Sequence, residues 1–113
     1  MAQANAIILR IRTEQADEFE RLFEAEELPL WDEYVGAGKF LKARLARIEF
    51  GTEERDDVAL YLLYVEVPSM REHGEHDRDP RFNAFLTKAR EFQPESPSVF
   101  GGTTIFEREA ASK

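Results

Sequence analysis

Residues 58–67 read VALYLLYVEV, and this run decides the fold because both of its alternating sets of side chains are apolar. One set consists of Val58, Leu60, Leu62 and Tyr64, and the other of Ala59, Tyr61, Leu63, Val65 and Val67. The run is short, rich in β-branched and aromatic residues and followed by Pro68, which favours a strand over a buried helix. A strand of this kind requires cover on both faces of its sheet.

The residues before this strand predict a first strand and a broken helix. Residues 6–12 alternate in the manner of a strand, and Thr13 offers an N-cap to the helix that follows. Pro29 predicts a break, because proline inside a helix removes a hydrogen bond and clashes with the preceding turn. A second short helix is therefore expected over residues 30–35. The apolar side chains at helical spacing before the break are Ala16, Phe19, Leu22 and Phe23.

The chain on either side of VALYLLYVEV predicts two further strands and a second helical region. Residues 40–50 alternate as a strand whose basic character suits a sheet edge, and residues 99–107 form the last strand. Ser69 caps a short helical turn that Gly74 weakens, and the Asp-Pro pair at 79–80 begins a longer helix. That longer helix presents on one face Phe82, Phe85, Leu86 and Ala89.

The predicted order of elements is strand, helix, strand, strand, helix, strand. Short connections and right-handed crossovers make this a single α+β domain over residues 1–113, a ferredoxin-like βαββαβ unit with one four-stranded antiparallel sheet. The first and third strands lie in the middle, and both helices cover one face. Because the central strand is apolar on both faces, we expect a second copy of the chain on the other face, giving a homodimer. Gly101 and Gly102 then mark a bulge or a close approach at the dimer seam.

The composition excludes several classes of function. The 113-residue chain carries a net charge of −8, and residues 13–35 alone hold nine acidic side chains and one basic side chain. Such an acidic surface repels phosphate and anionic lipid, so neither nucleic acid nor membrane is expected as a partner. The chain has no cysteine, and so no disulfide or cysteine nucleophile. Arg10 interrupts the short apolar run near the start, so we expect no signal peptide and a cytoplasmic location.

Four segments carry a resemblance to a known family. They are FERLFEAEELPLW, GKFLKARLARIEF, VALYLLYVEVPS and DPRFNAFLTKA, which together extend over most of the chain. In these segments the chain resembles the dimeric α+β barrel superfamily, in particular the group of antibiotic biosynthesis monooxygenases. The resemblance implies two sheets packed face to face across a two-fold axis, with a pocket between each sheet and its own helices.

The resemblance also implies a range of chemistry for that pocket. Members of the superfamily carry out cofactor-free oxidation of polycyclic phenols, haem degradation, decarboxylation and isomerisation. The haem degraders use an asparagine on the first strand, a tryptophan on the third and a histidine in the second helical region. Asn5 fits the first of these positions, but the third strand has Tyr61 and Tyr64 in place of tryptophan. The resemblance therefore does not extend to the haem site.

The polar run over residues 68–80 is the first candidate for a catalytic site. It contains both histidines of the chain, His73 and His76. A histidine of ordinary pKa, roughly 6.5, is able to act as a general acid or base near neutral pH. The spacing of three would also let both rings share a metal with Glu72 or Asp77, and the remaining alternative is an ordinary solvated loop. We take the two histidines as the candidate catalytic residues, with no metal.

Aromatic and basic residues provide the candidate substrate-binding positions. Tyrosine and tryptophan side chains would enclose a flat aromatic substrate, unless they are plain core residues with their polar ends at the rim. An inward-facing arginine would attract a carboxylate or an enolate, although arginines at strand ends also pair with acids or reach water. The candidate substrate-binding residues are Trp31, Tyr34, Tyr61, Tyr64, Arg10 and Arg44.

Two hypotheses for the function follow. The first is an enzyme that needs no cofactor and oxidises, or transforms in a related way, a small aromatic or polyketide-like molecule in a pocket between sheet and helices. The second is a non-catalytic dimeric barrel that binds a small molecule or belongs to a stress response. A pocket too small for a bicyclic ligand, or one that neither histidine reaches, favours the second.

Overall fold

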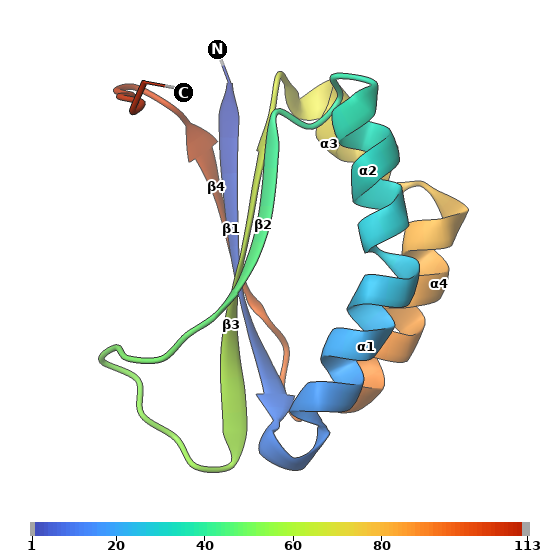
Figure 1. Ribbon diagram of the computed structural model, residues 1–113, viewed down its shortest axis with the longest axis vertical. Helices are drawn as coiled ribbons and strands as arrows, with labels where there is room; N and C mark the ends of the chain where they lie inside the picture. The colour runs from blue at the N-terminus through green and yellow to red at the C-terminus, as the bar shows by residue number, and fades with distance from the viewer. Residues whose placement is uncertain (1, 112–113) are drawn as a thin grey trace.

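The computed structural model describes residues 2–111 as two layers, a four-stranded antiparallel sheet and a layer of helices on one of its faces (Figure 1). The elements in chain order are β1 (Gln3–Arg12), the 3-10 helix η1 (Thr13–Gln15), α1 (Ala16–Glu26), α2 (Leu28–Gly36), β2 (Lys42–Arg47), β3 (Val58–Val67), α3 (Met70–Asp77), α4 (Pro80–Ala89), the 3-10 helix η2 (Arg90–Phe92) and β4 (Ser98–Thr103). None of the helices in this range is both long enough and apolar enough to span a membrane.

The sheet has the strand order β2-β3-β1-β4, with antiparallel pairing throughout. β1 and β3 pair along their whole length, from Gln3 opposite Val67 to Arg12 opposite Val58. These are the two central strands, and β2 and β4 form the edges. The ferredoxin-like topology predicted from the sequence is therefore confirmed.

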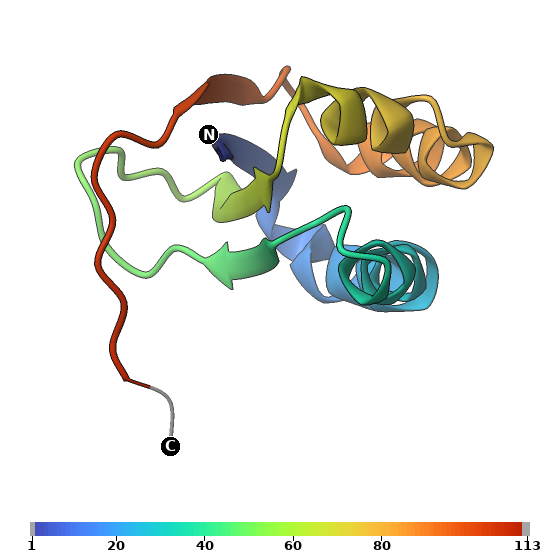
Figure 2. The ribbon, with the colours of Figure 1, turned by 90° about the horizontal axis from the view of Figure 1, so that it is seen from above.

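The two faces of the sheet differ in what covers them. One face packs against the helices, and its core includes Leu9, Ile11, Tyr61, Val67, Phe19, Phe23, Leu30, Trp31 and Phe85. The other face carries Ile8, Leu60 and Leu62, which are half-buried although no helix lies over them. Figure 2 shows the β2–β3 loop and the segment after β4 on this side, opposite the helices. The central strand is apolar on both faces, and its own chain provides helices for only one.

The broken helix is confirmed, with one correction at its start. α1 and α2 meet at Glu27, and Pro29 lies in the first turn of α2, where its missing N–H leaves no helical hydrogen bond unmade. Thr13 does not act as the N-cap, because it lies within η1 and its hydroxyl donates to the carbonyl of Asp56 at 2.8 Å. The hydroxyl thus ties the strand–helix turn to the β2–β3 loop.

The polar run after β3 is helical rather than a loop. Ser69 caps α3 as predicted, its Oγ accepting the N–H of the residue two positions on at 3.2 Å, and Asp79 caps α4 in the same way at 2.9 Å. The expectation that Gly74 leaves only a weak turn is wrong, because α3 is an eight-residue helix that contains Gly74 in its interior. The chain's two histidines are therefore held at fixed positions on a helix that packs against the core.

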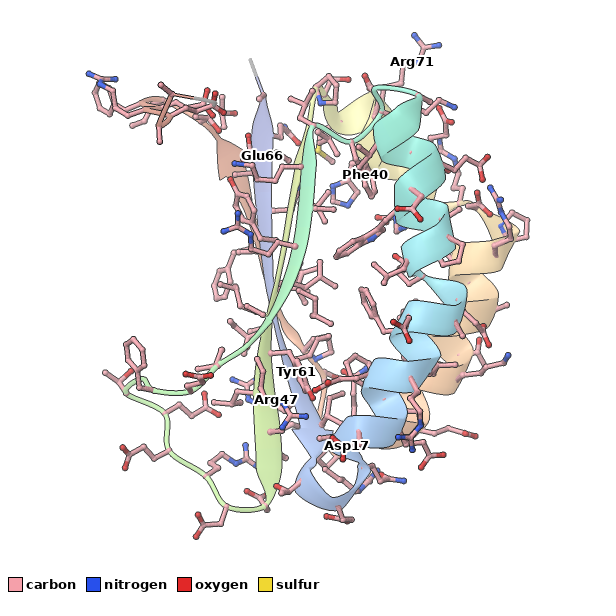
Figure 3. All side chains as sticks on the ribbon, viewed as in Figure 1. Asp17, Phe40, Arg47, Tyr61, Glu66 and Arg71 are labelled. Carbon is pink, nitrogen blue, oxygen red and sulfur yellow. The ribbon has the colours of Figure 1, made fainter. Side chains whose placement is uncertain are left out.

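Both edge strands are shorter than predicted. β2 has six residues instead of the expected 40–50, and Phe40 lies before it, buried on the helix side with its ring 5.1 Å from that of Tyr34 (Figure 3). β4 contains no bulge, since Gly101 pairs opposite Asn5 in unbroken register. The close approach expected at this glycine is to a neighbouring strand, because an added Cβ would lie 2.9 Å from Oδ1 of Asn5.

Candidate functional site

A cavity of about 500 Å³ lies between the sheet and the helices. β1 and β3 contribute apolar side chains to it, among them Ile7 and Leu63, and the helices contribute aromatic rings, among them Phe23 and Phe85. Polar side chains also line it, and three of them come from α3. The polar residues that line it are Asn5, Glu27, His73, His76, Asp77, Asn83, Arg90, Gln93 and Ser96. The cavity therefore combines a ring-sized apolar space with a group of acids and bases.

A buried acid–base pair, Glu27 and His76, forms part of the cavity wall. The two residues are 2% and 8% exposed, and Nε2 of His76 lies 3.0 Å from Oε2 of Glu27. The indole N–H of Trp31 donates to the same oxygen at 3.1 Å. The other carboxylate oxygen, Oε1, is buried and has no hydrogen-bond partner among residues 2–111. One oxygen of this carboxylate is thus held by two donors, and the other is free.

The second ring nitrogen of His76 also meets a carboxylate. Its Nδ1 lies 3.3 Å from Oδ1 of Asp77. Burial lowers the pKa of His76, but the hydrogen bonds to Asp77 and Glu27, together with the charges of both carboxylates, outweigh burial and raise the pKa to about 9. The ring is therefore a cation at neutral pH, placed between two carboxylates.

His73 takes a different partner from His76. Its Nε2 lies 2.8 Å from Oδ2 of Asp77, and its side chain is 27% exposed. Burial raises the pKa of Asp77, but the hydrogen bond from His76 and the charges of both histidines bring it below its ordinary value. Within the described part of the chain, no group of three or more histidine, aspartate or glutamate side chains is placed to hold a metal ion. The two rings are joined through Asp77 and do not converge on one point.

Aromatic rings hold the imidazole of His76 in place. Its centroid lies 4.3 Å from that of Phe82, 5.0 Å from that of Phe40 and 5.4 Å from that of Tyr34, the last with the rings perpendicular. The hydroxyl of Tyr34 donates to Oδ2 of Asp79 at 3.2 Å. Burial, followed by this hydrogen bond, raises the pKa of Tyr34 to about 12. Tyr34 is thus a support behind the histidine rather than a residue of the cavity wall.

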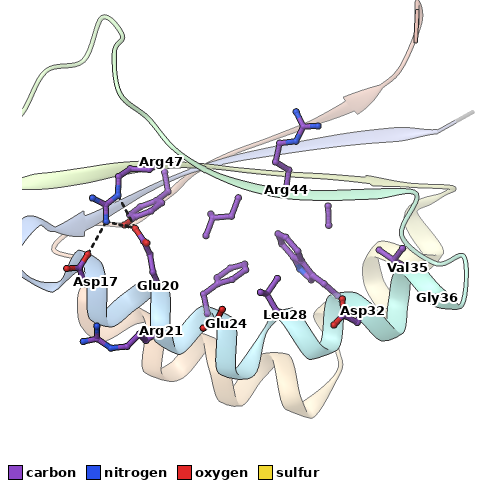
Figure 4. A pocket seen from close by; sticks show the side chains of 15 residues that line it. Asp17, Glu20, Arg21, Glu24, Leu28, Asp32, Val35, Gly36, Arg44 and Arg47 are labelled. Atoms are coloured by element: carbon purple, nitrogen blue, oxygen red, sulfur yellow. Dashed lines mark hydrogen bonds and ion pairs between the residues drawn. The ribbon is translucent and has the colours of Figure 1, made fainter. Parts of the chain in front are cut away.

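Three of the predicted site residues, His73, His76 and Trp31, line this cavity. Tyr61 faces the helices but lies in a separate open groove of about 910 Å³ between α1, α2 and β2 (Figure 4). There its hydroxyl donates to Glu20 at 2.6 Å, and burial, followed by this hydrogen bond, raises its pKa to about 12. The structure therefore separates this tyrosine from the histidines.

The remaining predicted site residues belong to the face of the sheet away from the helices. Tyr64 donates to Glu66 at 2.9 Å on that face. Arg10 forms salt bridges with Glu53 at 3.0 Å and Glu95 at 3.3 Å, which is the acid-paired alternative considered for the strand arginines. Arg44 borders the open groove, and Figure 4 shows its guanidinium pointing away from the helices. None of the three lines the cavity.

Glu27 is a residue of the cavity wall that was not among the candidate site residues predicted from the sequence. The sequence does contain a pattern that indicates this residue. Glu27 follows Phe19 and Phe23 at intervals of four, so it continues the buried stripe of α1. An acid at the next position of an apolar stripe, directly before a helix break, is a candidate for a buried functional carboxylate.

The fold and the cavity define a class of protein, the ferredoxin-like α+β domains with a ligand-sized space between sheet and helices. The fold is shared with solved structures of proteins named as antibiotic biosynthesis monooxygenases, as the resemblance in sequence implied. No family model and no curated protein sequence matches the chain.

Three solved structures illustrate the likeness. A protein named as an antibiotic biosynthesis monooxygenase from Caulobacter crescentus is 20% identical with a TM-score of 0.73, and another from Nitrosomonas europaea is 8% identical with a TM-score of 0.74; each alignment covers 93% of this chain and 91% of the other. The cofactor-independent oxygenase SnoaB from Streptomyces nogalater is 15% identical with a TM-score of 0.66, over 94% of this chain and 95% of its own. At these identities the likeness concerns the fold.

Proposed function

We propose that the chain binds a small aromatic molecule in the cavity and oxidises it with molecular oxygen, without a metal or an organic cofactor. The observation that carries the proposal is an aromatic-walled cavity with an acid–base pair, Glu27 and His76, buried in its wall. Such a site is able to hold a flat ring system and to move a proton at one position on it.

The size of the cavity supports an aromatic ligand. A volume of about 500 Å³ lies within the range of roughly 300–1,000 Å³ that small-molecule sites occupy. Phe23, Phe85 and Trp31 offer ring faces and edges to a bicyclic or tricyclic molecule. Neither condition that favours a non-catalytic protein is met, because the space is adequate for such a ligand and both histidines line it.

The proposed reaction begins with the loss of a proton from a CH₂ carbon beside a phenol or ketone ring. The electron pair stays on the substrate as a carbanion, which passes electrons to O₂ and combines with it to a hydroperoxide. Loss of water then leaves a carbonyl, so that one CH₂ group and one O₂ give one C=O and one H₂O. The imidazolium of His76 stabilises the anion, and His73, which is more exposed, supplies a proton to the departing water.

The structural neighbours support the same reaction class. SnoaB is named a cofactor-independent oxygenase, and two further neighbours are named as antibiotic biosynthesis monooxygenases. We propose that this chain has the activity that these names give, because it shares the fold of these proteins.

A homodimer paired through the uncovered face of the sheet is also part of the proposal. This face carries the half-buried Ile8, Leu60 and Leu62. Phe100 on β4 and Phe106 beyond it are 61% and 83% exposed. Apolar side chains gathered on one face in this way mark an interaction surface, and an identical face on a second copy is apolar to the same extent.

One observation favours a second candidate function, a binding protein without catalysis. Both ring nitrogens of His76 are already directed at carboxylates, Glu27 and Asp77, so the group is able to serve as a purely structural ion pair. In that case the cavity holds its ligand unchanged.

The single tryptophan of the chain, Trp31, lines both the cavity and the open groove, so quenching of its fluorescence is assigned to the cavity when a variant that fills the cavity abolishes it. Bicyclic and tricyclic phenols and aromatic ketones are titrated while its fluorescence is recorded, and oxygen uptake is then followed with a chelator present and no cofactor added. We expect saturable quenching and one carbonyl product per O₂ consumed. Ala89→Phe, which places a ring in the cavity, should abolish both signals. Quenching without oxygen uptake would favour the binding protein, and no quenching would contradict both candidates.

A further inference from the structure

We propose that Glu27, and not either histidine, is the group that receives the proton of the bound molecule, through its free oxygen Oε1. This inference rests on the proposed function, because it names the catalytic residue of the same cavity. It further assigns the ligand as a neutral molecule with a hydrogen-bond donor or an acidic C–H at the position that meets Glu27.

The two oxygens of Glu27 have unequal roles. Oε2 accepts from both Nε2 of His76 and Nε1 of Trp31, at 3.0 and 3.1 Å. Two donors fix the plane and the direction of a carboxylate, so the position of Oε1 is determined by the same contacts. Trp31 and His76 are therefore positioning residues for this oxygen.

Oε1 is buried and has no hydrogen-bond partner among residues 2–111. A buried acceptor without a hydrogen bond destabilises the protein, and a charged acceptor does so more strongly. Glu27 is 2% exposed and belongs to the cavity wall. Oε1 has less than 1 Å² of accessible surface, so a ligand reaches it after a small movement of the cavity wall. A ligand that then donates to Oε1 removes this destabilisation, whereas a carboxylate or another anion placed there would be repelled.

The hydrogen bonds of His76 exclude this residue as the base. Its Nε2 faces Glu27 and its Nδ1 faces Asp77, so each ring nitrogen serves as a donor to a carboxylate. Tyr34, which approaches from α2, has its ring perpendicular to the imidazole and directs its hydroxyl to Asp79. No lone pair of the imidazole remains for a substrate proton, and the pKa of about 9 agrees with this geometry.

The C–H or O–H bond of the ligand breaks, its proton bonds to Oε1 of Glu27, and the electron pair remains on the ligand. The carboxylate becomes a neutral acid, so Glu27 no longer offsets the positive charge of His76, which then stabilises the new anion through space within the same cavity. The charge of the site as a whole is unchanged, which allows the transfer to take place in a buried cavity. No oxidant is needed for this step.

A matched pair of probes tests the acceptor. Indole and benzofuran have the same bicyclic shape, but indole carries an N–H donor where benzofuran carries an acceptor oxygen. We expect the unmodified protein to bind indole about tenfold more tightly than benzofuran, measured by calorimetry, since a buried acceptor discriminates by about 1.4 kcal/mol or more. Equal affinities would overturn the assignment of Oε1, and no binding of either probe would contradict the proposed function itself. This comparison needs no variant.

The variant Glu27→Gln tests whether the preference for indole depends on Oε1 as an acceptor. His76 and Trp31 hold the amide oxygen at the former Oε2 position, so the NH₂ group takes the place of Oε1 and presents a donor to the cavity. We expect the preference for indole to disappear or to reverse toward benzofuran. The control is Glu24→Gln, an exposed acid of α1 outside the cavity, which should leave the preference unchanged.

Hydrogen–deuterium exchange tests proton transfer separately from binding. The bicyclic ketone 2-tetralone has an acidic CH₂ group, whose exchange in D₂O is followed by NMR. We expect catalysed exchange in the unmodified protein, a loss of about 100-fold or more in Glu27→Gln, and a smaller loss in His76→Gln, which keeps a donor for Oε2. Exchange that survives in Glu27→Gln and is lost in His76→Gln would assign the base to the histidine and overturn the inference. No catalysed exchange in the unmodified protein would also overturn it.

Discussion

The indole N–H of Trp31 donates to Oε2 of Glu27 at 3.1 Å, one helical turn away and across the junction of α1 and α2. The backbone keeps its helical hydrogen bond at the same place, from the N–H of Trp31 to the carbonyl of Glu27 at 2.9 Å. Pro29 lies between them in the first turn of α2. The break thus redirects the helix without loosening it, and it holds a buried carboxylate over the cavity.

The charge on His76 predicts how stability depends on pH. Its pKa of about 9 in the folded protein lies above the ordinary value of 6.5, so between these values the folded state keeps a proton that the unfolded state releases. The free energy of unfolding should therefore be highest below about pH 6.5 and fall as pH rises through about 9, by an amount on the order of 3 kcal/mol. Urea unfolding at pH 6, 7, 8 and 9 measures this decline.

The variant His76→Gln is the control for this decline. A glutamine at this position does not titrate, so its stability should be lower at pH 6 and nearly independent of pH between 6.5 and 9. The tyrosines Tyr34 and Tyr61 do not enter this window, because the pKa of each is raised to about 12. A variant whose stability falls as steeply as that of the unmodified protein would show that another group is responsible.

The fold could be predicted because each of its elements has a local signal. Period-two alternation identifies the strands, Pro29 the helix break, and Ser69 and Asp79 the starts of α3 and α4. The failures occur where tertiary contacts override local preference. Gly74 is tolerated inside α3, which packs on the core, and Phe40 leaves the strand pattern to pack on Tyr34.

The candidate site could be predicted only in part, because its geometry joins distant segments. The two histidines and Trp31 were selected by residue type, and all three line the cavity. The pair of Glu27 with His76 spans 49 positions of sequence, so no local spacing reveals it. Tyr61 and Tyr64 are three residues apart and therefore point to opposite faces of the sheet, a consequence of period two that a list of aromatic residues does not express.

Asp79 supports the site from behind and should be sensitive to substitution. Its Oδ1 caps α4 at 2.9 Å and its Oδ2 accepts from the hydroxyl of Tyr34 at 3.2 Å. Asp79→Ala should cost about 1–2 kcal/mol through the lost cap alone, with further losses from the tyrosine hydroxyl and from the salt bridge of Asp79 with Arg81. Tyr34→Phe leaves the cap in place but removes the hydroxyl, which also lies 3.4 Å from the carbonyl of Glu75, and should cost about 1 kcal/mol. Equal losses in the two variants, measured by urea unfolding, would contradict the capping role.

Gly101 should not tolerate a larger residue. A Cβ added there would lie 2.9 Å from Oδ1 of Asn5. The Nδ2 of the same side chain donates to the carbonyl of Val65 at 3.4 Å. Gly101→Ala should therefore cost about 1–3 kcal/mol, as overpacking does elsewhere. Gly102→Ala is the matched control, since its Cβ would meet nothing within 4 Å. Adding Asn5→Ala should recover part of the loss, and a fully additive double variant would contradict the proposed clash.

The proposed dimer predicts a change of oligomeric state from a single charge on the uncovered face. Leu62 lies at the middle of this face, opposite Ile8 on β1, and no helix covers it. At micromolar concentration the unmodified protein should sediment with twice the mass of the 13.1-kDa chain. Leu62→Lys should sediment as a monomer, because burying an unpaired ammonium between two sheets costs several kcal/mol. Thr87→Lys adds the same charge on the exposed side of α4 and should leave the dimer intact. A monomeric unmodified protein would mean that the apolar face is covered by something other than a second copy.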